Sequence, residues 1–186
     1  MRILYVSDAA SVHTRRWAEA FRDAGDEVHG ASLRPAAIDG VTVHVLPTWA
    51  LGKAGYLRAV PALRALGRRL RPDVVHAQYV TSYGFLAAAA GLSPRVVTAW
   101  GTDVLVSPNE SRVSRALARR ALSTADAVTT VAGHMVPAVL ALGAPPARVQ
   151  ALPFGVDTQL FTPPPVPDHD VYDAPVRSHR TSSPGS

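Results

Sequence analysis

The sequence contains no cysteine, which excludes disulfide bonds, thiolate catalysis and cysteine-ligated metal sites. It also lacks a long hydrophobic run. The longest apolar stretch, residues 85–92, is far shorter than the ~20 residues that span a bilayer. The apolar start at residues 3–6 is shorter than the ~7–15 residues at the centre of an export signal. We therefore expect a soluble, cytoplasmic protein.

Lysine is nearly absent too, because Lys53 is the only one and arginine supplies the other fixed positive charge. The formal net charge of +5 suits nucleic acid, an anionic membrane or a phosphorylated ligand. No zinc-finger or basic-zipper pattern accompanies it, so nucleic acid is not an expected partner. Arginines cluster at residues 64–71 and 112–120. Basic helices can lie on anionic lipid, but a solvated face is the interpretation we favour over peripheral membrane contact.

Apolar, β-rich segments alternate with segments of helical periodicity as far as residue 152. The pattern predicts strands at residues 3–6, 27–33, 41–46, 74–76, 95–99, 127–131 and 149–152, and helices at 11–24, 53–70, 82–91, 111–122 and 134–142. Pro61 should bend or divide the second helix. Such alternation is typical of right-handed βαβ crossovers. It predicts an α/β fold, a Rossmann-like doubly wound parallel sheet of about six or seven strands.

The composition changes after Phe161. Six prolines stand between Thr162 and Ser186, and the remaining residues are mostly small or charged. Such a stretch buries too little apolar surface to offset its ordering entropy. We therefore expect one domain over residues 1–162 and a disordered tail over residues 163–186.

Ligands of an open parallel sheet bind at the carboxyl ends of its strands, and the first strand is followed by a small-residue turn into a helix. Backbone amides at a helix start favour an anion, and Ser11, His13 and Arg16 are candidates to line the cleft there. The alternative is that Asp8 or Ser11 simply caps the helix and that Arg16 is solvated.

The strand predicted at residues 74–76 brings His76 and Gln78 to the same edge of the sheet. We take both as candidates for the cleft because polar side chains at strand ends are often functional. The alternative for His76 is a buried histidine with its hydrogen bonds satisfied.

The next strand leads into Trp100, Gly101, Thr102 and Asp103. Gly101 permits a tight turn or a close approach to a ligand, and Trp100 offers a face for a sugar ring. Asp103 is the candidate catalytic residue, because a carboxylate there can bind sugar hydroxyls or act as a base. The alternatives are that Asp103 caps a turn and that Trp100 belongs to the core.

Gly155 and Asp157 belong to a segment that we expect to form a structured exit loop from the domain. No Asp-x-Asp motif occurs before the expected tail, so no metal is expected. The first loop also lacks the G-x-G-x-x-G fingerprint of dinucleotide binding. A nicotinamide or flavin enzyme is therefore the least favoured interpretation, although fold alone does not exclude it.

Four segments in this order resemble the N-terminal half of glycosyltransferase family four. They are Pro-Asp-Val-Val-His-Ala at 72–77, Val-Val-Thr-Ala-Trp-Gly-Thr-Asp-Val-Leu at 96–105, Ala-Asp-Ala-Val-Thr-Thr-Val at 125–131, and Pro-Phe-Gly-Val-Asp at 153–157 with Phe161. The resemblance extends from residue 1 to about residue 162. It departs from many relatives at Trp100, where they carry histidine, and in the first loop, where they carry a pair of glycines.

The resemblance implies a retaining enzyme of the GT-B fold that uses a nucleotide-sugar, UDP-, GDP- or ADP-linked, as a co-substrate and no tightly bound cofactor. The N-terminal domain of this family mainly binds the acceptor, here a sugar, glycan or lipid. The C-terminal domain holds most of the donor site, including a Glu-x₇-Glu pair; in this sequence no glutamate follows Glu110. We therefore expect the acceptor-side half of a hexose-transferring enzyme, truncated before a donor domain or subunit that would complete it. The alternatives are a non-catalytic acceptor-binding or docking module and an inactive truncated product.

Overall fold

The computed structural model describes residues 1–48, 58–155, 158 and 162. By its internal contacts the chain divides into two units, Met1–Pro153 and Phe154–Ser186. All of the helices and strands below belong to the first unit. The predicted disordered tail over residues 163–186 lies outside the described residues, as does most of the exit loop.

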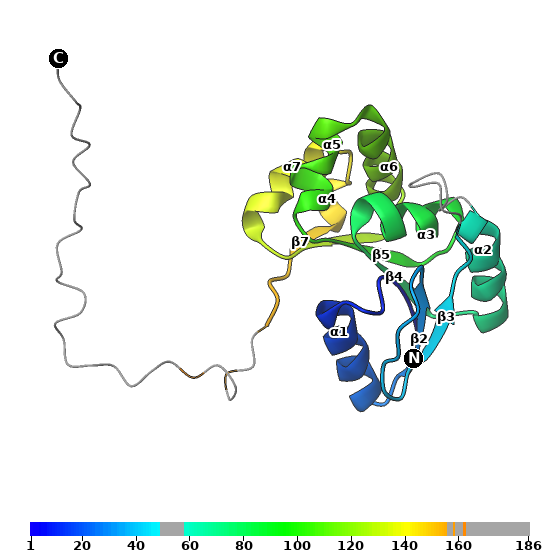
Figure 1. The fold of residues 1–186 in the computed structure, drawn as a ribbon. Coiled ribbons are helices and arrows are strands. Elements are labelled where there is room, and N and C mark those ends of the chain that lie inside the picture. The colour runs from blue at the N-terminus through cyan, green and yellow to red at the C-terminus, as the bar shows by residue number, and fades with distance from the viewer. Residues whose placement is uncertain (49–57, 156–157, 159–161, 163–186) are drawn as a thin grey trace, which may run out of the picture. The chain divides into compact units, whose positions relative to one another are not determined.

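A single parallel sheet of seven strands forms the centre of the first unit (Figure 1). The strands are β1 (Arg2–Val6), β2 (Glu27–Ser32), β3 (Thr42–Val45), β4 (Val74–Gln78), β5 (Arg95–Ala99), β6 (Ala127–Thr130) and β7 (Val149–Ala151). Their spatial order is β3-β2-β1-β4-β5-β6-β7, and every neighbouring pair is parallel. The predicted Rossmann-like, doubly wound fold is confirmed, because the chain winds outward from β1 in both directions.

Helices pack on both faces of this sheet. They are α1 (Val12–Asp23), α2 (Ala59–Leu70), α3 (Phe85–Ala89), α4 (Thr102–Leu105), α5 (Ser107–Glu110), α6 (Arg112–Ser123) and α7 (Val136–Ala141). Helix α1 lies against one face, and α2, α3, α6 and α7 contribute to the core on the other face (Figure 1). Parallel sheets depend on this double cover, because both of their faces are apolar.

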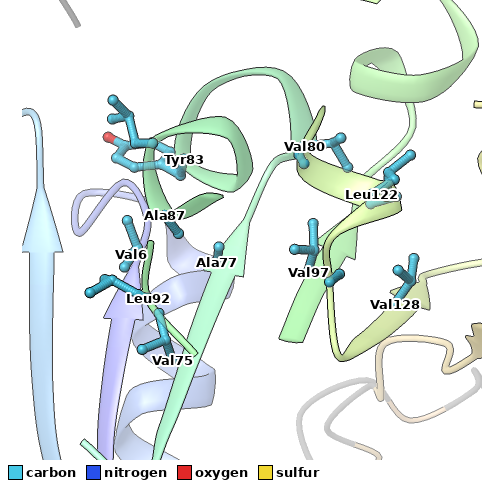
Figure 2. Close-up of a cluster of buried hydrophobic side chains, with 14 of the residues drawn as sticks. Val6, Val75, Ala77, Val80, Tyr83, Ala87, Leu92, Val97, Leu122 and Val128 are labelled. Carbon is cyan, nitrogen blue, oxygen red and sulfur yellow. The ribbon is translucent and has the colours of Figure 1, made fainter. Parts of the chain in front are cut away.

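The larger core lies between the sheet and the layer that contains α2, α3 and α6 (Figure 2). Alternate residues of a strand point to opposite faces, so Val75 and Ala77 of β4 enter this core. Their neighbours His76 and Gln78 face α1 instead, and both are buried. A smaller core on that side includes Tyr5.

Local signals set the ends of the first helix. The Ser11 side chain accepts a hydrogen bond from the backbone N–H of His13 at 3.3 Å, which satisfies one of the free amides at the start of α1. Gly25 follows the helix with φ of +91°, a left-handed conformation that glycine adopts at low cost.

Several predicted boundaries are wrong. Pro61 lies in the first turn of α2, where no intrahelical N–H bond is lost. Residues 53–57 of the predicted helix lie outside the described residues, so the division of that helix at Pro61 stays a prediction. The helix predicted over 82–91 is a π-helix at Val80–Gly84 followed by the short α3. The helix predicted over 134–142 begins as a 3-10 turn at Gly133–Met135 before α7. The short helices α4 and α5 were not predicted at all.

Among the described residues, no helix combines the length and the hydrophobicity that crossing a bilayer requires. The longest helices have 12 residues, which at ~1.5 Å per residue gives roughly 18 Å. That is well short of the ~30 Å hydrocarbon core.

Leu63 tests how much the larger core contributes to stability. Its side chain is fully buried on α2, so Leu63→Ala should lower the free energy of unfolding by about 2–5 kcal/mol. Leu140→Ala is the matched control, because Leu140 is 37% exposed, and it should cost under about 1 kcal/mol. Urea unfolding at neutral pH measures both, and equal losses in the two variants would contradict the packing described for α2.

Candidate functional site

A pocket of about 410 Å³ opens at the carboxyl ends of the strands. Its lining comes from the loop after β1, the loop after β2, the end of β4 and the residues that follow β4 and β5: Asp8, Ser11, Arg34, Gln78, Tyr79, Ser82, Tyr83 and Trp100. The volume lies within the range of small-ligand sites, and a few polar groups on an apolar lining are typical of them. Ser11, Gln78 and Trp100 were predicted from the sequence, whereas Arg34, Tyr79, Ser82 and Tyr83 were missed.

Asp103 stands behind this pocket and is fully buried. Its carboxylate accepts hydrogen bonds from the backbone N–H groups of Val80 at 2.7 Å, Gly101 at 2.8 Å and Trp100 at 3.0 Å. Burial raises the pKa of Asp103, and the three backbone N–H groups act in the opposite direction. In this structure the Asp103 oxygens are turned to the backbone, which fits the alternative interpretation that Asp103 caps a turn. It acts as a positioning residue that joins the loops after β4 and β5.

Tyr79 is the first residue after β4, and its backbone is in the left-handed region with φ of +73°. A non-glycine residue in that region stores strain that the surrounding contacts must hold. Its hydroxyl lies 3.1 Å from the Thr102 Oγ1, and its ring centroid lies 6.5 Å from that of Trp100. The π-helix that follows is a rare element that is frequent at functional sites. Neither feature has a signature in the sequence.

The start of α1 forms the opposite side of the pocket. Ser11 caps the helix and also lines the pocket. The two positions considered for it from the sequence, a helix cap and a place at the cleft, are therefore compatible. The His13 ring lies 5.3 Å from the Trp100 ring in an edge-to-face arrangement, which places it beside the pocket. Asp8 forms an ion pair with Arg34 at the rim. Arg16 is exposed and does not line the pocket.

Gln78 connects the pocket to the sheet beneath it. The residue is buried, and its Oε1 accepts a hydrogen bond from the Thr14 hydroxyl at 2.9 Å. Its Nε2 has no hydrogen-bond partner among the described residues. A buried amide without a partner is costly, so this N–H₂ group favours an acceptor oxygen brought by a ligand or by water.

His76 is not at the strand end that was predicted for it. It lies inside β4 under α1, is 7% exposed, and its ring packs 5.1 Å from both Tyr5 and Trp17. Its Nε2 lies 2.6 Å from the Thr98 hydroxyl. Burial lowers the pKa of His76 to about 4, so the ring is neutral near pH 7. His76 is therefore a core histidine, as the alternative interpretation stated, and not a residue of the cleft.

The remaining predicted residues lie apart from the pocket lining. Thr102 begins α4 and meets Tyr79, and Gly101 turns the chain with φ of +132°, which only glycine adopts readily. Gly155 is exposed, and Asp157 lies outside the described residues. Across the described part of the chain, no three histidine or carboxylate side chains gather in a way that could hold a metal ion.

The family described as "Glycosyl transferase 4-like" matches this chain over residues 2–132. No curated protein sequence matches it significantly. Among solved structures, the Anabaena Alr3699/HepE protein in complex with UDP-glucose shares 16% identity with a TM-score of 0.65, over 86% of this chain and 45% of that one. Sucrose-phosphate synthase from Thermosynechococcus elongatus shares 15% identity with a TM-score of 0.66, over 88% and 50% of the two chains.

A UDP-N-acetylglucosamine 2-epimerase is also similar, with 11% identity and a TM-score of 0.58 over 80% of this chain and 46% of that one. At such identities the likeness concerns the fold alone, and this fold is shared by a sucrose-phosphate synthase and by an epimerase. The chain spans about half the length of these three structures.

Removing the Asp103 carboxylate should loosen both strand-end loops. Asp103→Ala leaves one buried and two part-buried backbone N–H groups without their acceptor, and we expect a loss of about 3 kcal/mol in the free energy of unfolding. The amides of Val80, Trp100 and Gly101 should also exchange with solvent faster than in the wild type, which NMR hydrogen exchange measures. Asp39→Ala is the control, because the Asp39 side chain is 99% exposed. Unchanged exchange at the three amides would refute the positioning role.

His76 should make stability depend on pH. Its folded pKa of about 4 lies below the unfolded value of roughly 6.5, so only the unfolded chain takes up this proton between those values. The free energy of unfolding should therefore fall as the pH drops through that window, by about 3 kcal/mol in total. His76→Gln should remove this component in urea titrations, and His134→Gln, at an exposed position, should retain it. Burial also lowers the pKa of His44. This residue is present in the wild type and in both variants, so the difference in pH dependence between the proteins reports on His76.

Proposed function

Because the chain belongs to the glycosyl transferase 4-like family, we propose that it is the acceptor-side half of a nucleotide-sugar-dependent glycosyltransferase. Residues 1–162 would form this acceptor-side domain. A donor domain or subunit would supply the other half, and a hexose-type sugar would pass to a sugar, glycan or lipid acceptor. The observation that carries the proposal is the family match over residues 2–132 together with the pocket at the carboxyl ends of the strands.

The proposed donor is a nucleotide-sugar with a UDP, GDP or ADP group. Support comes from the Anabaena protein, whose structures are described as complexes with UDP-glucose and with UDP. In this chain the start of α1 is the element suited to face the donor phosphates. Its backbone amides and the positive end of the helix dipole favour an anion there, and His13 and Arg16 add polar groups on the same helix.

The chemistry of the pocket suits a hydroxyl-rich acceptor. Trp100 and Tyr79 offer aromatic faces on which a sugar ring can lie. The Gln78 amide and the Ser11 hydroxyl can form hydrogen bonds with ring hydroxyls. Asp8 is held by Arg34 at the rim, which gives the pocket an acceptor and a donor side by side.

The described residues of this chain bind and orient the acceptor rather than supply a base. Asp103 is turned away from the pocket by its three backbone hydrogen bonds, and Asp8 is paired with Arg34. The neutral His76 lies in the core. Placing the acceptor hydroxyl next to the donor sugar is itself a large contribution to rate, because it removes translational and rotational freedom before reaction.

Trp100 is the residue whose change should separate acceptor binding from folding. Trp100→Ala should weaken the binding of acceptor sugars by about tenfold, which corresponds to the loss of one aromatic stacking contact. NMR titration with mono- and disaccharides measures the affinity through the amides of Tyr79 and Gln78. Val12→Ala is the control, since Val12 is 62% exposed and does not line the pocket. If no saccharide shifts those amides in the wild type, the acceptor assignment is wrong.

Transfer is tested separately by adding a donor domain of the same family, in cis or in trans, and following nucleotide release from UDP-, GDP- and ADP-sugars. Release that depends on both halves and on the acceptor supports the proposal. Acceptor binding without any release would instead identify a non-catalytic binding module.

A further inference from the structure

Charge is divided unevenly along the described chain. Residues 1–48, which include α1, carry five arginines and six acidic residues. Residues 58–123, which build the layer from α2 to α6, carry ten arginines and three acidic residues. Of those three, Asp73 precedes β4 and Asp103 of α4 is buried, so Glu110 is the one exposed acidic side chain on the helices of that layer. Nine of the ten arginines are exposed, since only Arg95 is buried.

Helix α6 concentrates this charge. Its exposed positions include Arg112, Arg115, Arg119 and Arg120, which lie on one half of the helix at 100° per residue. Within the described residues, no carboxylate lies within ion-pair distance of any of the four. The buried half of α6 packs on the core through residues such as Leu122.

Apolar side chains are exposed beside these arginines. Val113 of α6 is 62% exposed, Val106 between α4 and α5 is 43% exposed, and Leu105 of α4 and Leu140 of α7 are each 37% exposed. Single exposed apolar residues are ordinary, but here four come from elements that adjoin one another (Figure 1).

A groove joins these elements. It has a volume of about 240 Å³ and lies between α4, α5, α6 and α7. Leu105, Ala138 and Leu142 give it apolar walls, and Arg115 and Arg119 also line it. Arg115 is held there by hydrogen bonds from its Nε to the Pro108 carbonyl and from its Nη2 to the Asn109 Oδ1, both at 3.1 Å. The groove therefore has apolar walls and two arginine side chains.

We propose that this surface is a docking site for an anionic lipid bilayer. We call it the basic face and define it by Leu105, Val106, Arg112, Val113, Arg119 and Arg120. Arginines at such a surface attract anionic headgroups, while exposed aliphatic side chains enter the boundary between headgroups and acyl chains. This inference is independent of the proposed function, because none of these residues lines the pocket at the strand ends.

A bilayer fits the basic face better than a nucleic acid does. Helices α4 to α7 contain no phenylalanine, tyrosine or tryptophan, and stacking on aromatic rings is the usual means of holding single-stranded bases. Aliphatic side chains between the arginines gain nothing from a phosphate backbone, whereas they can insert among the acyl chains of a bilayer. From the sequence alone we favoured a solvated face over membrane contact for these arginines. The structure favours membrane contact instead, because it places the exposed apolar residues of α4 and α7 next to α6.

The first test is co-sedimentation of the whole chain with vesicles of equimolar phosphatidylglycerol and phosphatidylcholine, and with vesicles of phosphatidylcholine alone. Binding should require the anionic lipid and weaken as salt is raised. Arg112→Glu with Arg119→Glu should lower the partition coefficient at least about tenfold. Arg15→Glu with Arg16→Glu is the matched control, because it makes the same charge change at exposed positions of α1 and should keep most of the binding.

The second test uses the absence of cysteine, which lets one dye be attached at one introduced site. Val113→Cys and Val12→Cys carry the label at positions that are both 62% exposed, on opposite faces of the sheet. With anionic vesicles, the emission of an environment-sensitive dye should shift to the blue at position 113 and stay unchanged at position 12.

Both results together support the proposal. It is overturned if anionic vesicles do not bind the chain, if both arginine pairs matter equally, or if the dye at position 113 does not respond. Binding to duplex DNA with the same dependence on Arg112 and Arg119, and no vesicle binding, would assign the basic face to nucleic acid instead.

Discussion

The carboxylate of Asp103 is the group on which the geometry of the pocket depends. It accepts N–H groups from Val80 after β4 and from Trp100 and Gly101 after β5, so one buried side chain joins two loops that the sheet alone would leave independent. This tie helps to hold Tyr79 in a left-handed conformation, because Val80 is fixed immediately after it. The aromatic rings of Tyr79 and Trp100 then meet edge to face and form one side of the pocket. The Asp103 carboxylate therefore shapes the pocket through the backbone and does not face it.

The parallel sheet imposes the second constraint, since both of its faces must be covered. Here the two covers differ in character. Helix α1 brings a balanced set of charges and a helix start that opens on the pocket, whereas the layer from α2 to α7 brings the larger core and most of the arginines. One side of the molecule therefore suits a polar ligand at the strand ends, and the other suits an extended anionic surface. Because the two surfaces share no lining residue, each can be altered without removing the other.

The same fold occurs in a sucrose-phosphate synthase and in a UDP-N-acetylglucosamine 2-epimerase, so the seven-stranded sheet does not decide between these activities. The family match and the pocket residues do more, because they specify which side chains meet a ligand. The pocket of this chain offers hydrogen-bonding groups and aromatic faces, with both nearby carboxylates engaged. The proposed acceptor-binding role rests on these features.

The fold class and a sheet of about six or seven strands follow from the sequence alone, and the structure has seven. Apolar runs such as residues 3–6 and 95–99 and the cap at Ser11 are local signals, and the structure confirmed each of them. The placement and the partners of the polar side chains depend on tertiary packing and are absent from local sequence patterns. His76 and Gln78 lie in one strand two positions apart and share a face, yet α1 covers His76 while Gln78 reaches the pocket. Arg34 and Tyr83 are distant along the chain and meet only in the folded protein, and Asp103 faces backbone amides of two separate loops. Periodicity reports which side of an element is apolar, but the partner of a polar side chain depends on how elements far apart in sequence pack together.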